Sequence, residues 1–207
     1  MKQLLTACSL LIATLNNVYA EDATMALRDK LKAMDSFSAN FQQTLYDEAD
    51  QELQQSQGAA KLKRPGHLYW STQSPYENLM IADNKTLWRY DIDLEQVTQQ
   101  PLDKNLSQTP ALLLSGEVAN IDKNFVVRRT EQGEDQTTFI LEPKRADSLL
   151  RQLSLTFKAD AISSMRIVDD LQQRTDIEFS DVVVNAEIDA DVFKFEVPPG
   201  VDLLTNE

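Results

Sequence analysis

The chain has 207 residues and a formal net charge of −13, with one Cys and one His. Its 42% hydrophobic and 26% charged composition is that of a folded protein, and its length suits one domain with a sizeable core. The acidic balance argues against binding to nucleic acid or to anionic lipid head groups, and the scarcity of Cys and His argues against a zinc site or a catalytic triad. We therefore expect neither a metal nor a cofactor.

Residues 1–20 are predicted to be a signal peptide that is cleaved after Ala20, which leaves 21–207 as a single domain. Lys2 supplies the positive start, and an apolar run follows from Leu4 to Leu15. This run is shorter than the ~20 residues that a membrane-spanning helix needs. The cleavage would remove the only Cys, and an exported chain without cysteine fits a bacterial periplasm.

A second interpretation of the leader is a lipid anchor, because Leu5-Thr6-Ala7-Cys8 resembles a lipobox. A lipobox lies at the end of the apolar run, whereas most of this run follows Cys8. We therefore expect an exported, soluble monomer with no stable membrane anchor.

The first mature segment, 23–34, is predicted to be an amphipathic helix. Ala23, Leu27, Leu31 and Met34 share one face at helical spacing. From Phe37 the period changes to two, which indicates a half-buried antiparallel strand. The polar stretch 47–57 is predicted to be a long hairpin loop or frayed strand ends.

Alternation with a period of two recurs along most of the remaining chain, and turn residues separate the alternating segments. Asp83-Asn84-Lys85, for example, indicates a hairpin turn. The further predicted strand segments lie at 60–72, which a Pro65-Gly66 break interrupts, and at 79–81, 86–90, 95–99, 125–130, 137–141, 152–157, 164–168 and 174–179. Short strands at this spacing predict a barrel or a strongly curved antiparallel sheet with a few helices, a mainly β (α+β) fold.

One short apolar helix interrupts the strands at 109–115. Thr109 suits the N-cap, Pro110 suits the first helical position, and Gly116 ends the helix. Between them lies an apolar run of Leu112, Leu113 and Leu114.

Catalysis finds little support in the sequence. His67 stands alone and is interpreted as a loop or strand-surface residue, and no nucleophile or metal-ligand motif is present. The pairs Asp169-Asp170 and Asp189/Asp191 are interpreted as a hairpin turn and a helix cap. An enzyme whose two carboxylates meet through space stays open at this point.

Binding finds better support, because one face of the predicted sheet is apolar and two apolar helices are available to cover it. The alternative is an ordinary filled core. The candidate lining residues are Leu27, Leu31, Phe37, Phe41, Leu62, Leu68, Trp70, Phe139, Leu141 and Leu155.

Arg64 has the same strand parity as Leu62, Leu68 and Trp70, which places a guanidinium among apolar side chains. Such a group must be hydrogen-bonded, because a buried and unsatisfied charge costs several kcal/mol. The carbonyl groups that end a short covering helix would be suitable acceptors. The alternative is an Arg at a strand end that reaches solvent.

Several strings occur in the order found in a known family. They are Phe37-Ser38-Ala39-Asn40-Phe41-Gln42-Gln43, Lys63-Arg64-Pro65, the run from Asp83 to Tyr90, Thr109-Pro110 with its leucines, and the run from Phe193 to Val201. In these strings the chain resembles the periplasmic outer-membrane lipoprotein carrier (LolA) family across nearly its whole length.

The resemblance implies an open, incomplete β-barrel with a helical lid over a cavity for acyl chains. It further implies that triacylated lipoproteins are received from an inner-membrane ABC transporter and passed to an outer-membrane receptor. Arg64 matches the family arginine that ties the lid helix to the barrel. Leu68 departs from relatives that carry a larger aromatic residue there.

Two other classes of function remain. A related half-barrel could act as a lipoprotein receptor or an envelope-stress sensor, although Cys8 is poorly placed to anchor a receptor. A lipid-modifying enzyme is disfavoured, because the sequence offers no evident nucleophile and base.

Overall fold

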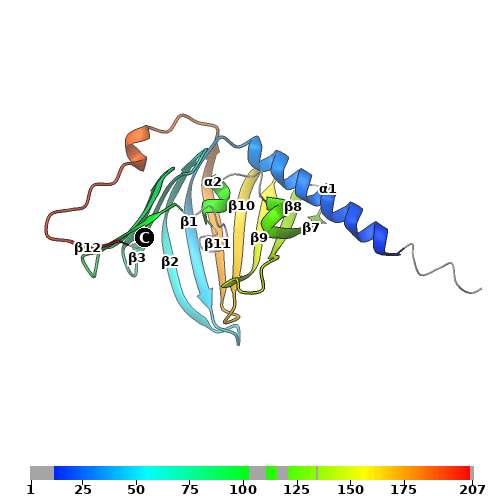
Figure 1. The fold of residues 1–207 in the computed structure, drawn as a ribbon, viewed down its shortest axis with the longest axis horizontal. Coiled ribbons are helices and arrows are strands. Elements are labelled where there is room, and N and C mark those ends of the chain that lie inside the picture. Colours follow the sequence, from blue (N-terminus) through cyan, green and yellow to red (C-terminus); the bar gives the residue numbers. More distant parts are fainter. Residues whose placement is uncertain (1–11, 103–110, 116–120, 134, 206–207) are drawn as a thin grey trace, which may run out of the picture.

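A single curved sheet of twelve strands dominates the computed structural model, which describes residues 12–102, 111–115, 121–133 and 135–205. The strand order is β12-β6-β5-β4-β3-β2-β1-β11-β10-β9-β8-β7, and β7 and β12 form its two separate edges. The strands are β1 (Ser36–Tyr46), β2 (Glu52–Lys63), β3 (His67–Ser74), β4 (Asn78–Asp83), β5 (Thr86–Asp91), β6 (Gln96–Pro101), β7 (Phe125–Gln132), β8 (Gln136–Pro143), β9 (Leu150–Lys158), β10 (Ala161–Asp169), β11 (Arg174–Val184) and β12 (Asp202–Thr205). The predicted class, an open and mainly β architecture with few helices, is confirmed (Figure 1).

Helix α1 (Ile12–Lys32) lies across the β7–β9 part of the sheet (Figure 1). The predicted inward residues Leu27 and Leu31 are fully buried, and Met34 is buried just beyond the end of the helix. The helix begins before the predicted start at Ala23, because no Gly or Pro interrupts residues 12–22. Cleavage after Ala20 would fall within α1 and stays a prediction.

Two short helices, α2 (Ala111–Ser115) and α3 (Ile121–Asn124), separate β6 from β7. The predicted apolar helix is therefore present at 111–115, while Thr109, Pro110 and Gly116 lie outside the described residues. Helix α2 packs against β2 and β3. Among the described helices, none combines the length and the apolar character needed to cross a lipid bilayer.

The hairpin between β1 and β2 is tighter than predicted. β1 ends at Tyr46 and β2 begins at Glu52, so residues 47–51 form the connection. Residues 52–57, the rest of the polar stretch, are strand rather than loop. The Asp47 carboxylate accepts hydrogen bonds from the backbone N–H groups of Ala49 and Gln51, both at 2.9 Å. In residues 52–57 of β2, Leu53 is the only apolar side chain and polar residues occupy both faces, so the alternation that identifies a strand is missing.

The C-terminal segment contacts β3 and β4 and ends as β12, a strand that the sequence analysis does not predict (Figure 1). It includes a 3-10 turn, η2 (Ala190–Phe193), which the Asp189 side chain caps by accepting from Asp191 N–H at 3.0 Å. The Phe195 ring lies 5.4 Å from that of Trp88, between centroids. β12 then pairs with β6 in parallel, so this segment covers one side of the sheet and extends its edge.

Candidate functional site

The apolar interior contains every predicted lining residue within one cluster. Strands from both halves of the sheet and helix α1 contribute to it, and the three leucines of α2 belong to the same cluster. All are at most 6% exposed: Leu27, Leu31, Phe37, Phe41, Leu62, Leu68, Trp70, Leu112, Leu113, Leu114, Phe139, Leu141 and Leu155. In this conformation the covering helices and the sheet pack directly against each other.

A stacked aromatic pair lies in the β1–β3 part of this cluster. The rings of Phe41 and Trp70 lie 4.4 Å apart between centroids, at an interplanar angle of 28°. Gly58 of β2 lies opposite Phe41, and a Cβ there would come within 1.9 Å of the Ser71 carbonyl oxygen and 2.6 Å of Phe41 Cζ. The missing side chain at Gly58 therefore makes room for the aromatic pair.

Polar contacts fasten α1 at its C-terminal half. Arg28 forms an ion pair with Asp122 of α3. Lys30 Nζ donates to the Ala159 carbonyl at 2.9 Å and pairs with Asp160 at 3.2 Å. The helix is thus tied to both α3 and the β9–β10 turn at the rim of the interior.

Arg64 follows β2 and is partly buried, as its parity predicts. Its Nε donates to the Met34 carbonyl at 3.0 Å, and its backbone N–H donates to the Asp35 carbonyl at 2.8 Å. Burial lowers the pKa of Arg64 to about 10, and the nearby Asp35 charge partly opposes this shift. The guanidinium is therefore charged at neutral pH, and its bond to the carbonyls of α2 stays a prediction.

Gly66 links α2 to the sheet, a contact that the sequence analysis did not predict. Its N–H donates to the carbonyl of Ser115, the last residue of α2, at 2.8 Å, and its own carbonyl accepts from Asn84 N–H at 3.0 Å. Its φ is +71°, and a Cβ would lie 2.4 Å from Asn84 Oδ1. Glycine is thus required where the chain links α2 to the β4–β5 hairpin, and the Pro65-Gly66 break is the sequence signal for it.

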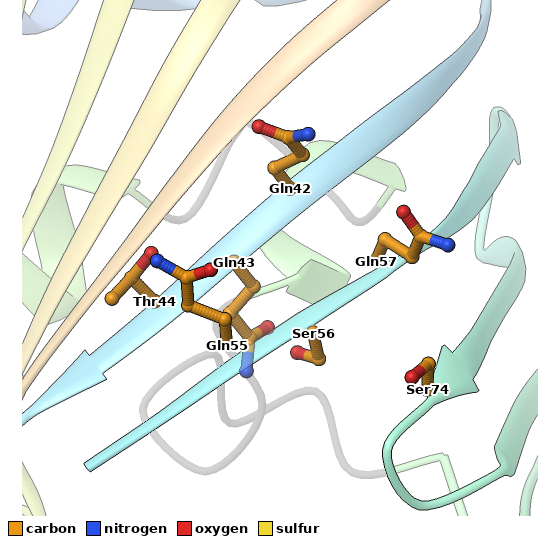
Figure 2. A pocket seen from close by; sticks show the side chains of 7 residues that line it. All are labelled: Gln42, Gln43, Thr44, Gln55, Ser56, Gln57 and Ser74. Carbon is orange, nitrogen blue, oxygen red and sulfur yellow. The ribbon is translucent and has the colours of Figure 1, made fainter. Parts of the chain in front are cut away.

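A second, polar feature lies on β1 and β2, where the side chains that face the interior change from apolar to polar. Beyond Phe41, the next inward positions on β1 and β2 are Gln43 and Ser56. A hollow of about 300 Å³ lies here, and Figure 2 shows its lining side chains. They are Gln42, Gln43, Thr44, Gln55, Ser56, Gln57 and Ser74.

The carboxylate pairs take the structural roles predicted for them. Asp169 accepts from Gln173 N–H at 2.8 Å in the β10–β11 turn, and Asp189 caps η2. His67 lies on β3 with its ring 5.3 Å from that of Phe193, under the C-terminal segment. Within the described part of the chain, no three His, Cys, Asp or Glu side chains group as metal ligands would.

The fold places the chain among open, incomplete β-barrels, in which one curved, mainly antiparallel sheet has its apolar face covered by helices. The model of the outer membrane lipoprotein carrier protein family, LolA, matches residues 32–196, and the chain belongs to this family.

Curated relatives agree over most of the chain. It is 44% identical over 180 residues to the outer-membrane lipoprotein carrier protein of Hahella chejuensis, covering 86% of each chain. It is 42% identical over 188 residues to that of Pseudomonas aeruginosa, covering 90% of each. Identity to that of Alcanivorax borkumensis is 36% over 208 residues and all of both chains.

Solved structures at low identity share the fold. An uncharacterized conserved protein from Thermus thermophilus matches with a TM-score of 0.52 at 10% identity, covering 88% of this chain and 98% of its own. A DUF1329 family protein from Desulfovibrio piger matches with a TM-score of 0.51 at 8% identity, covering 85% and 97%.

Proposed function

We propose that this chain is a periplasmic carrier that takes up outer-membrane lipoproteins by their acyl chains. The main support for this proposal is the single apolar cluster between the sheet and the covering helices, in a chain of the LolA family. The relatives named outer-membrane lipoprotein carrier protein support the cargo class.

The cargo is a triacylated lipoprotein, received from an inner-membrane ABC transporter and delivered to an outer-membrane receptor. The protein acts as an exported monomer after cleavage at Ala20, and it performs no chemical reaction on the cargo. The full chain has a net charge of −13, and loss of Lys2 with residues 1–20 makes it −14, which suits a soluble protein that does not bind anionic head groups.

A self-packed interior suits reversible binding. Each buried CH₂ contributes ~0.8 kcal/mol, so three acyl chains in a rigid, preformed pocket would be held too tightly to release. Here Leu112, Leu113 and Leu114 already pack into the interior, and acyl chains must displace them. Re-closure of α2 then competes with the cargo and lowers its net affinity.

Arg64 and Gly66 form the latch of this mechanism. Gly66 N–H donates to the end of α2, and Arg64 Nε donates to Met34 just after α1, so both covering helices are held beside the same β2–β3 turn. Lipoprotein entry would break the α2 contact, and its re-formation would favour release.

Co-purification tests the proposal directly. The protein isolated from periplasmic extract should bring intact lipoprotein, and the acylated species should leave it when a receptor is added. Isolation with no acylated partner, or with a chemically modified lipid product, would contradict a carrier function. The variant Leu94→Glu, at a 70% exposed turn position, serves as a surface control.

A further inference from the structure

The end of the β1–β2 hairpin combines an open strand edge with a neutral polar hollow. β2 begins at Glu52, but its pairing with β3 begins only at Gln57. Residues 52–56 of β2 therefore pair with β1 on one side, and no described strand lies on the other. Figure 2 shows β3 ending at Ser74 and the chain turning away from β2 there.

The hollow is lined by four Gln, two Ser and one Thr, so its side chains carry no charge. Glutamine amides both donate and accept, and can bind the N–H and C=O groups of any peptide backbone. In the part of the chain that the structure describes, Gln55 alone among the seven makes a side-chain hydrogen bond, to Glu52 at 3.2 Å. The other six side chains keep their hydrogen-bonding capacity for a ligand.

The hollow adjoins the apolar interior. Successive same-face residues on a strand lie about 7 Å apart, so the inward row passes from Phe41 to Gln43 within one such step. A ligand with its acyl chains in the interior would meet this polar surface where its polar part leaves the interior.

We propose that this edge and hollow bind the extended polypeptide that follows the acylated residue of the cargo, as an added β-strand beside residues 52–56 of β2. The proposal rests on the proposed function, which supplies an acylated polypeptide as the ligand. An open edge binds backbone groups whatever the sequence, and the neutral lining imposes no preference for the charge of the tail. Five β2 residues span about 17 Å, so a tail of about eight residues is long enough.

Triacylated S-glycerylcysteine, with no tail or with a neutral tail of about eight Ser, Gly and Thr residues, tests this directly. The wild type should bind the tailed probe about tenfold more tightly, the gain that one or two net hydrogen bonds supply. Amide hydrogen exchange in residues 52–56 should slow with the tailed probe and not with the tailless one. Equal affinities with unchanged exchange would overturn the peptide site.

Charge variants make the test specific. Gln42 and Gln57 are exposed cross-strand partners on the opposite face of the hairpin from Gln43, and a strand added at the β2 edge places every second side chain on that face. Q42E/Q57E should therefore weaken binding of a Glu/Ser tail at least about fivefold and strengthen that of a Lys/Ser tail. It should leave binding of the tailless probe unchanged. Q132E/Q136E places the same pair of charges on the β7–β8 hairpin and should have no such effect. An equal response in both variants would overturn the proposal. If the tailless probe fails to bind the wild type, the proposed carrier function itself fails.

Discussion

Arg64 joins the end of β2 to the residue that follows α1, through its bond to the Met34 carbonyl. Strand parity predicts that its guanidinium lies among apolar side chains. The acceptor could not be predicted from the sequence, because 30 residues separate the two groups and only the folded path of α1 brings them together. A charge-assisted hydrogen bond of this kind is worth ~1.5–3 kcal/mol.

Arg64→Leu should retain cargo. It removes the donor that holds the residue after α1 beside the β2–β3 turn, and with it the predicted bond to the α2 carbonyls, so the open conformation gains population. Lipoprotein left on the purified variant after incubation with receptor should exceed the wild-type amount severalfold. Arg64→Lys should retain an intermediate amount of lipoprotein, since an ammonium keeps the charge but lacks the planar guanidinium with its several N–H donors. Normal release from Arg64→Leu would refute the latch.

The pH dependence of the free energy of unfolding gives a second test at Arg64. The folded-state pKa is lowered to about 10, so below about pH 9 both folded and unfolded states hold the proton. The stability difference between wild type and Arg64→Leu should therefore be constant from about pH 6 to pH 9. Above about pH 10 the unfolded state binds more protons, so stability of the wild type should rise relative to the variant. Urea titrations at each pH measure this, and a steep change near neutrality would contradict it.

Gly58 is required by packing at the aromatic pair. Gly58→Ala should cost about 1–3 kcal/mol of unfolding free energy, since its Cβ meets the Ser71 carbonyl and the Phe41 ring. The near-ultraviolet circular dichroism of the stacked Trp70 should also change. Gly133→Ala is the control, because a Cβ there meets no atom within 4 Å and only its φ of +70° opposes the substitution. An unchanged aromatic spectrum in Gly58→Ala would contradict this role.

At the scale of elements, α2 is the part of the cover that the sequence predicts best, and its leucines occupy the interior as expected. Leu112→Glu should weaken binding of a triacylated probe at least tenfold, because it places a carboxylate where acyl chains would enter. Its far-ultraviolet spectrum should match that of the wild type, and Leu94→Glu should bind normally. If Leu112→Glu binds the probe normally, or if it loses the folded far-ultraviolet spectrum, this face is ordinary core and not the acyl-chain site.

Strands with one covered face were predictable because their apolar residues alternate, as in β1 and β3. The start of β2 was not predictable, since residues 52–57 hold only one apolar side chain, Leu53, and polar residues occupy both faces. β12 escaped prediction for another reason: its four residues are all exposed, and its position beside β6 depends on the path of the C-terminal segment. The spacing of Phe193 and Phe195 indicates burial, but it does not indicate which part of the sheet they cover.

At the scale of the whole molecule, the sheet separates two apolar regions with different roles. The inner cluster lies under α1 and α2 and contains Trp70. The outer one lies under the C-terminal segment and includes Trp88, whose ring contacts that of Phe195. We expect the inner region to open for cargo and the outer one to stay packed, so each tryptophan reports on one side of the sheet.

These two tryptophans are the only ones in the chain, and they allow the central claim to be tested in one measurement. A triacylated lipopeptide with brominated acyl chains is titrated into two single-tryptophan variants, and fluorescence quenching is recorded. Trp88→Phe, which keeps Trp70, should be strongly quenched, while Trp70→Phe, which keeps Trp88, should be quenched little at saturation. Equal quenching in both variants, or quenching of Trp88 alone, would contradict an acyl-chain site in the interior.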